Sequence, residues 1–80
     1  MNNLEKLNEA FVNALQITDD QVTDALKYQE IPEWDSISHM VLISEIEDTF
    51  DISLDTEDVI DMSSVAKAKE IIQKYEISFE

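Results

Sequence analysis

The sequence predicts an all-α fold, a small antiparallel bundle of three long helices plus one short helix, with a long loop between helices one and two. Apolar residues recur at helical spacing in three segments, whereas the one alternating run, around Ile52 and Leu54, is too short for a sheet. The 80 residues include no Gly and a single Pro, and no repeat is visible. With 44% apolar residues at this length, we expect residues 1–80 to form a single domain.

The first long helix is predicted over residues 3–16. Its apolar residues fall on one arc at about 100° per residue. They are Leu4, Leu7, Phe11, Val12, Ala14 and Leu15. Asn2 is a favoured N-cap residue, and Glu5 stands at the spacing of its reciprocal partner, so we expect the helix to begin directly after Asn2.

Residues 17–34 are predicted to form the long connection. Thr18 and Gln21 have the spacing of a second capping pair, so one or two helical turns are expected near them. Pro32 has no backbone N–H and favours an extended conformation at Ile31. We expect Trp34, at the end of the connection, to pack over the core; the alternative is an exposed docking role.

The second long helix is predicted from Asp35 or Ser36, both favoured N-cap types, to about Phe50. It carries apolar residues on two faces, and the predicted core face holds Leu42, Ile43, Ile46 and Phe50. The other face holds Ile37, Met40 and Val41, beside Ser44 and Asp48. Either the 17–34 connection folds over this second face, or the face is a docking surface rimmed by Glu47, Asp48 and Asp51.

A short helical turn and a third long helix complete the predicted fold. Asp55 is expected to cap the turn, which runs through Ile60, and Ser63 or Ser64 starts the last helix. The apolar arc of that helix holds Val65, Ala68, Ile71, Ile72 and Tyr75. Its opposite side holds Lys67, Glu70 and Lys74.

Negative charge dominates the chain and is unevenly placed. Five basic residues against 19 acids give a formal net charge of −14. No basic residue lies between Lys27 and Lys67, and eight acids fall between Glu45 and Asp61. This balance disfavours nucleic acid and anionic lipid as partners. The acids form either a solvated face or a docking face for a protein with a Lys- and Arg-rich patch.

Composition also limits chemistry and location. With no Cys, the chain has no disulfide, no thiolate metal site and no catalytic thiol of its own. No stretch approaches the roughly 18 apolar residues of a membrane span, and no signal peptide is visible. We therefore expect a cytoplasmic monomer without membrane insertion.

Catalytic and metal sites are not predicted. His39 follows Ser36 by one turn, but no carboxylate at suitable spacing and no Gly-rich oxyanion loop supports a nucleophile–base pair. We expect His39 to be packed or half-exposed. A calcium loop starting at Asp51 fails, because Thr56 and Met62 stand where Gly and Glu are needed.

The second helix resembles that of the acyl carrier protein family. The likeness rests on Asp35-Ser36-Ile37, Leu42, Ile46, Glu47 and Phe50, and with helix order, size and acidity it extends from about Leu4 to Tyr75. It implies that Ser36 is the attachment point for 4′-phosphopantetheine, which a phosphopantetheinyl transferase adds from coenzyme A. The arm of such a carrier ends in a thiol that holds acyl groups as thioesters. Asp35 matches the family position beside the metal during that transfer.

The same resemblance implies which residues meet partner enzymes. Ile37, Met40 and Ser44 match positions on the second helix that contact partners, and Val41 lies among them. Glu47 and Asp48 match acids that pair with the basic patches of acyl-loading and acyl-using enzymes.

Three departures set this chain apart from the usual family pattern, and its Trp34-Asp35-Ser36 opening is similar to that of specialised stand-alone carriers of polyketide, aminoacyl or surface-polysaccharide assembly. Trp34 replaces a small residue, Ile37 replaces Leu, and Val41 and Ser44 replace a commonly acidic and a commonly apolar residue. The alternative function is an unmodified acidic helical adaptor or inhibitor that binds a basic protein.

Overall fold

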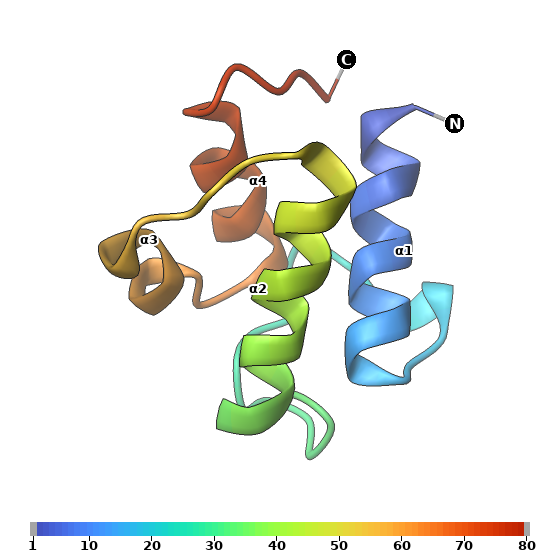
Figure 1. The fold of residues 1–80 in the computed structure, drawn as a ribbon. Helices are drawn as coiled ribbons and strands as arrows, with labels where there is room; N and C mark the ends of the chain where they lie inside the picture. The colour runs from blue at the N-terminus through green and yellow to red at the C-terminus, as the bar shows by residue number, and fades with distance from the viewer. Residues whose placement is uncertain (1, 80) are drawn as a thin grey trace.

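The computed structural model describes residues 2–79, which form four α-helices and one turn of 3₁₀ helix (Figure 1). The elements in order are α1 (Asn3–Leu15), η1 (Asp19–Gln21), α2 (Ser36–Phe50), α3 (Thr56–Asp61) and α4 (Val65–Gln73). Within residues 2–79 no strand is present, apart from an isolated bridge between Lys27 and Ser64. The predicted all-α class is therefore confirmed. No helix among these residues has the length and apolar character needed to cross a membrane.

Side-chain caps fix the starts of α1, α2 and α4 where the sequence predicts them, whereas Asp55 precedes α3 without a capping side-chain hydrogen bond. The Asn2 side chain accepts a hydrogen bond from the Glu5 N–H at 2.8 Å, and the Ser64 hydroxyl accepts one from the Lys67 N–H at 3.0 Å. Thr18 precedes η1, and its N–H donates to the Gln21 side chain at 3.1 Å. The Glu5 and Lys67 N–H groups lie in the first turns of α1 and α4, and the Thr18 N–H lies just before η1. Each of these bonds therefore satisfies a backbone N–H that has no partner within the helix.

Two predicted helix ends need correction. The first helix ends at Leu15, because Gln16 takes a left-handed conformation with φ of 59° and caps it. The last helix ends at Gln73, so Tyr75 lies beyond it. The Tyr75 side chain is nevertheless partly buried against the core, as its place on the predicted apolar arc requires.

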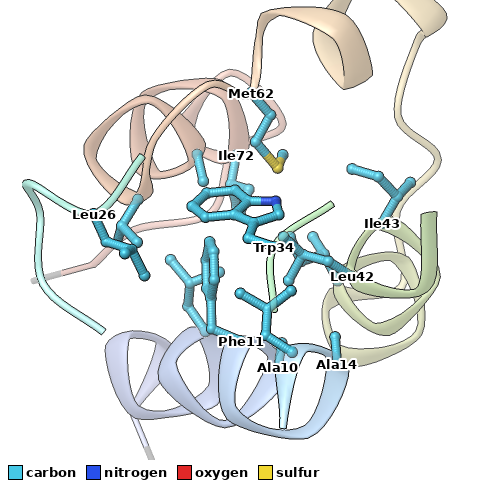
Figure 2. Close-up of a cluster of buried hydrophobic side chains, with 14 of the residues drawn as sticks. Ala10, Phe11, Ala14, Leu26, Trp34, Leu42, Ile43, Met62 and Ile72 are labelled. Atoms are coloured by element: carbon cyan, nitrogen blue, oxygen red, sulfur yellow. The ribbon is translucent and has the colours of Figure 1, made fainter. Parts of the chain in front are cut away.

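The core is built around Trp34, which is fully buried (Figure 2). The rings of Phe11 and Trp34 meet edge to face with centroids 5.3 Å apart. In the same close-up Leu42, Met62 and Ile72 surround the indole from α2, from the α3–α4 link and from α4. The expectation that Trp34 packs into the core is confirmed, and its burial fixes the end of the long connection immediately before α2.

The predicted core face of α2 is confirmed for three of its four residues. Leu42, Ile43 and Ile46 are buried, whereas Phe50 is only half-buried. Phe50 meets the ring of Phe79 edge to face, with centroids 6.2 Å apart. The tail after α4 therefore packs back against the end of α2.

The tail also contacts the start of α1. The Asn3 amide donates to the Ser78 carbonyl at 2.8 Å. Residues 74–79 thus leave the helix and pack against the other elements, while Glu80 lies outside the described residues.

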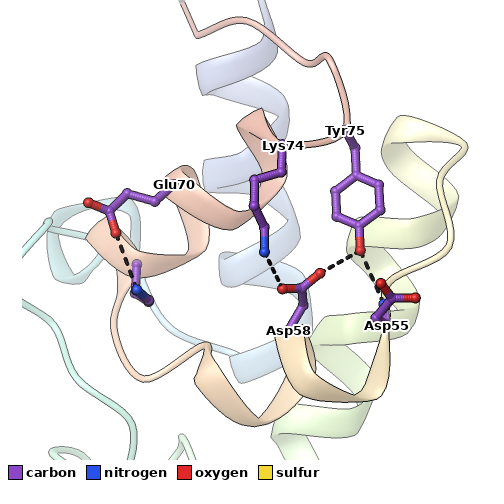
Figure 3. A network of polar contacts seen from close by, with 6 residues as sticks. Asp55, Asp58, Glu70, Lys74 and Tyr75 are labelled. Atoms are coloured by element: carbon purple, nitrogen blue, oxygen red, sulfur yellow. Dashed lines mark hydrogen bonds and ion pairs between the residues drawn. The ribbon is translucent and has the colours of Figure 1, made fainter.

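A buried acid joins α3 to the end of α4 (Figure 3). Asp58 is only 6% exposed, and its two carboxylate oxygens accept hydrogen bonds from the Lys74 ammonium at 2.6 Å and the Tyr75 hydroxyl at 2.5 Å. The Tyr75 oxygen in turn accepts the Asp55 N–H at 3.2 Å. The bond from Lys74, followed by that from Tyr75, lowers the pKa of Asp58 below its ordinary value. Lys74, predicted on the solvent side of α4, therefore also anchors α3.

Truncating Trp34 should destabilise the fold strongly. We expect Trp34→Ala to lower the free energy of unfolding by about 3–5 kcal/mol, because it removes the largest buried side chain and leaves a cavity. Chemical denaturation with urea measures this change. Ile37→Ala, at an exposed position, is the control and should change stability by no more than about 0.5 kcal/mol. Equal effects of the two substitutions would contradict the central role of Trp34.

Asp58 should make stability sensitive to acid. Because its pKa is lower in the folded chain than in the unfolded chain, its contribution is complete above the ordinary aspartate pKa of about 4 and is lost as the pH falls through the folded value. We expect Asp58→Asn to unfold at a lower temperature than the wild type near neutral pH, with the difference shrinking as the pH is lowered below about 4.

Thermal unfolding followed by circular dichroism across this pH range measures the difference. Glu57→Gln, at the exposed neighbouring position, is the control and should track the wild type. If the difference in melting temperature between Asp58→Asn and the wild type stayed constant as the pH fell below about 4, the carboxylate charge would not be what stabilises the network.

Candidate functional site

Ser36 is the first residue of α2, and its side chain is exposed. Its hydroxyl makes no hydrogen bond to any residue of the described chain, 2–79. Ser38, only two residues further, differs completely: its hydroxyl donates to the Glu33 carbonyl at 2.6 Å and accepts the Asp35 N–H at 2.9 Å. Of these two serines at the start of α2, Ser38 has a structural role and Ser36 has a hydroxyl free to react.

Asp35 is the N-cap of α2 and holds the helix start in place. One of its carboxylate oxygens accepts the N–H groups of Ile37 and Ser38 at 3.0 and 2.9 Å. Led by the bond from the Ser38 N–H, these contacts lower the pKa of Asp35, so the carboxylate beside Ser36 is charged at neutral pH. The predicted cap is confirmed, and it fixes the start of α2 so that Ser36 is the first residue of the helix.

The second apolar face of α2 is open to solvent. Ile37, Met40 and Val41 are 77%, 58% and 46% exposed, and Ser44 and Asp48 on the same side are exposed as well. We call Ile37, Met40 and Val41 the α2 patch. The alternative that the 17–34 connection covers this face is therefore wrong, because the connection turns its last residue, Trp34, into the core on the other side of the helix.

The acids of the expected rim differ in their surroundings. Glu47 is half-buried, and one of its carboxylate oxygens accepts the Leu54 N–H at 2.8 Å, so it also holds the link between α2 and α3. Asp48 and Asp51 are exposed. Asp48 is thus free to meet a basic partner, whereas Glu47 has a structural contact that the sequence pattern did not reveal.

His39 is half-buried and has both ring nitrogens engaged. Its Nδ1 accepts the Trp34 indole N–H at 3.0 Å, which leaves the ring proton on Nε2 to donate to the Val59 carbonyl at 2.9 Å. The expectation that His39 is packed or half-exposed is confirmed. With Nδ1 and Nε2 occupied, the ring is not available as a base for Ser36.

The site offers an attachment point and no evident metal cage. Within residues 2–79, no group of three or more His, Asp or Glu side chains could hold a metal ion. A covalent group on Ser36 would lie next to the Asp35 carboxylate and at the edge of the α2 patch. This arrangement can carry a tethered group and present it to another protein.

The acidic segment between Glu45 and Asp61 should make stability depend on salt. Among the described residues, Asp58 is the one acid of this segment that forms an ion pair. Screening weakens repulsion among the others, so we expect the melting temperature to rise from low to moderate ionic strength. Thermal unfolding at several salt concentrations measures the slope, which should be smaller in Asp48→Asn. A wild-type melting temperature unaffected by salt would contradict this picture.

The sequence matches no known family among those compared and no curated protein. The candidate site is therefore defined by what the structure brings together: the free hydroxyl of Ser36, the capping carboxylate of Asp35, and the α2 patch with its acidic border.

Proposed function

We propose that this protein is an acyl carrier protein, with 4′-phosphopantetheine on Ser36 and acyl intermediates carried on that arm as thioesters. One observation carries the proposal: the exposed, unbonded hydroxyl of Ser36 opens a helix whose solvent side combines the α2 patch with uncompensated acids. The sequence resemblance to acyl carrier proteins depends on the same segment.

Ser36 takes part in a single bond-forming step. In the loading reaction its hydroxyl oxygen forms a phosphodiester with the pantetheine phosphate of coenzyme A, the nucleotide part leaves, and the hydroxyl proton passes to the transferase or to solvent. The N-terminus of α2 favours the new negative charge through the helix dipole, while the Asp35 carboxylate opposes it. The transferase supplies the catalytic groups, and this chain supplies the positioned nucleophile.

A carrier needs weak and exchangeable docking more than tight binding. Tethering keeps the acyl group at high effective concentration near each enzyme in turn. Asp48 and the other unpaired acids speed encounter with basic surfaces, and the α2 patch adds short-range apolar contact. The protein itself then has no catalytic role, and a cytoplasmic monomer suits this transport function.

We further propose that the helices of this carrier form an antiparallel bundle. This is supported by α1 and α2, which lie side by side and run in opposite directions (Figure 1). Trp34, one of the three departures of this chain from the family pattern, is buried. A transferase docking at Ser36 therefore meets the exposed neighbours Glu33 and Asp35 and not the indole.

Loading of Ser36 tests the proposal directly. After incubation with coenzyme A, magnesium and a broad-specificity phosphopantetheinyl transferase, we expect intact-mass spectrometry to show the gain of one phosphopantetheine. Ser36→Ala should abolish the gain. Ser63→Ala, which removes an exposed hydroxyl from the link between α3 and α4, outside the proposed partner surface, is the control and should be loaded like the wild type.

Absence of loading with several transferases would overturn the carrier proposal. The acidic adaptor or inhibitor would then be the better description, because it uses the α2 patch and the acids without needing Ser36. Loading that persists in Ser36→Ala would instead show that the attachment point is wrongly assigned.

A further inference from the structure

An acyl group attached to Ser36 through a flexible arm lies either in water or inside the protein. Exposure to water disfavours an apolar acyl chain, and the unfavourable free energy grows with each methylene group. Because protein cores are close-packed, the interior accepts such an acyl chain only where space is free or a side chain moves aside. The packing near Ser36 therefore decides which acyl chains the protein can shelter.

The interior next to Ser36 is occupied by the indole of Trp34. Trp34 stands two positions before Ser36 and is the largest of the fully buried side chains in the described residues. Figure 2 shows the indole between Phe11 of α1, Leu42 of α2 and Ile72 of α4. Each of these three neighbours is itself 0% exposed. The place where the three helices meet is thus filled by one aromatic side chain.

Aromatic contacts and one hydrogen bond hold the indole in this place. The rings of Phe11 and Tyr28 meet it edge to face, with centroids 5.3 and 6.1 Å from its own. Its N–H donates to Nδ1 of His39 at 3.0 Å. An acyl chain that displaced the indole would remove these contacts and take the acceptor from a buried N–H, which is strongly unfavourable in a protein interior. Trp34 is therefore not a side chain that moves aside easily.

A surface hollow beside the tail offers little shelter to an apolar acyl chain. The hollow has a volume of about 560 Å³ and lies at the end of the molecule opposite to the start of α2 (Figure 1). It is lined by Gln73, Glu76, Ile77, Ser78 and Phe79. Three of these five residues are polar, whereas sites for apolar ligands are lined mainly by apolar and aromatic side chains.

We infer that Trp34 limits the cargo of the proposed carrier to short or polar acyl groups. Its indole occupies the interior space that a long apolar acyl chain would need. Acyl groups of the short or polar class remain on the arm in water, where the next enzyme reaches them without drawing them out of the protein. The inference rests on the proposed carrier function and adds the class of its substrate.

Two coenzyme A thioesters of different acyl length test this limit. Acetyl- and octanoyl-coenzyme A, used with the broad-specificity transferase, place the two acyl groups on Ser36, and intact-mass spectrometry confirms each product. In the wild type we expect the two forms to melt within about 2 °C of each other, because the octanoyl chain is in water in both the folded and the unfolded state. Thermal unfolding followed by circular dichroism measures the difference.

Trp34→Leu should make stability depend on the acyl group. This substitution removes the indole but keeps an apolar side chain, so it opens space in the core. We expect the octanoyl form of the variant to melt at least about 5 °C above its acetyl form, because the acyl chain refills that space. A purely structural role of Trp34 would lower the melting temperatures of both forms equally.

Phe50→Leu is the matched control. It is another aromatic-to-Leu substitution, at a half-buried position at the far end of α2 from Ser36. Its acetyl and octanoyl forms should melt together, as in the wild type.

Fluorescence gives a second test that needs no substitution and so does not depend on the folding of Trp34→Leu. Trp34 is the only Trp in the sequence, so its emission reports on the core alone. We expect the acetyl and octanoyl forms of the wild type to have the same emission maximum and the same quenching by acrylamide.

The outcomes separate the two proposals. If the wild type accepts neither phosphopantetheine nor its acyl forms, the carrier function and the cargo limit fall together. If the wild type is loaded and the octanoyl group raises its melting temperature or shifts the Trp34 emission, the carrier stands and the cargo limit is wrong. Equal behaviour of Trp34→Leu and Phe50→Leu would show that Trp34 is not the residue that sets the limit.

Discussion

Burial of the Trp34 indole is the constraint on which the remaining structure depends. It lies at full depth in the core, contacts Phe11 edge to face, and directs its N–H to His39. Because Asp35 and Ser36 follow at once, the position of the indole sets where α2 begins. The irregular 17–34 connection is thereby fixed in position at its last residue, two positions before the candidate attachment residue Ser36.

Stability and function are divided between the two sides of α2. Leu42, Ile43 and Ile46 on one side join the core, while Ile37, Met40 and Val41 on the other remain in solvent. Exposing three adjoining apolar side chains in an otherwise polar setting has no benefit for folding. A surface of this kind is understandable if other proteins cover it intermittently.

Local chemistry made most of the fold predictable from the sequence. Caps such as Asn2, Asp35 and Ser64 act within three residues, and helical spacing alone separated the two faces of α2. The burial of Asp58 and the second hydrogen bond of His39 were not predictable in this way. The hydrogen bond between Lys74 and Asp58 and the one between His39 and Val59 join residues that are 16 and 20 positions apart in the sequence. Both bonds form only when α3 packs against the other elements, so the spacing of apolar residues does not reveal them.

The packing of the tail has a geometric consequence. The bond from Asn3 to Ser78 brings the two ends of the described chain together at one end of the molecule, and α2 begins at the other end (Figure 1). A surface anchor, an affinity tag or a fused domain joined at the end of the molecule where Asn3 and Ser78 lie would therefore be on the opposite side of the structure from the start of α2. The protein can therefore be immobilised or joined to a larger polypeptide while Ser36 and the start of α2 remain exposed to solvent.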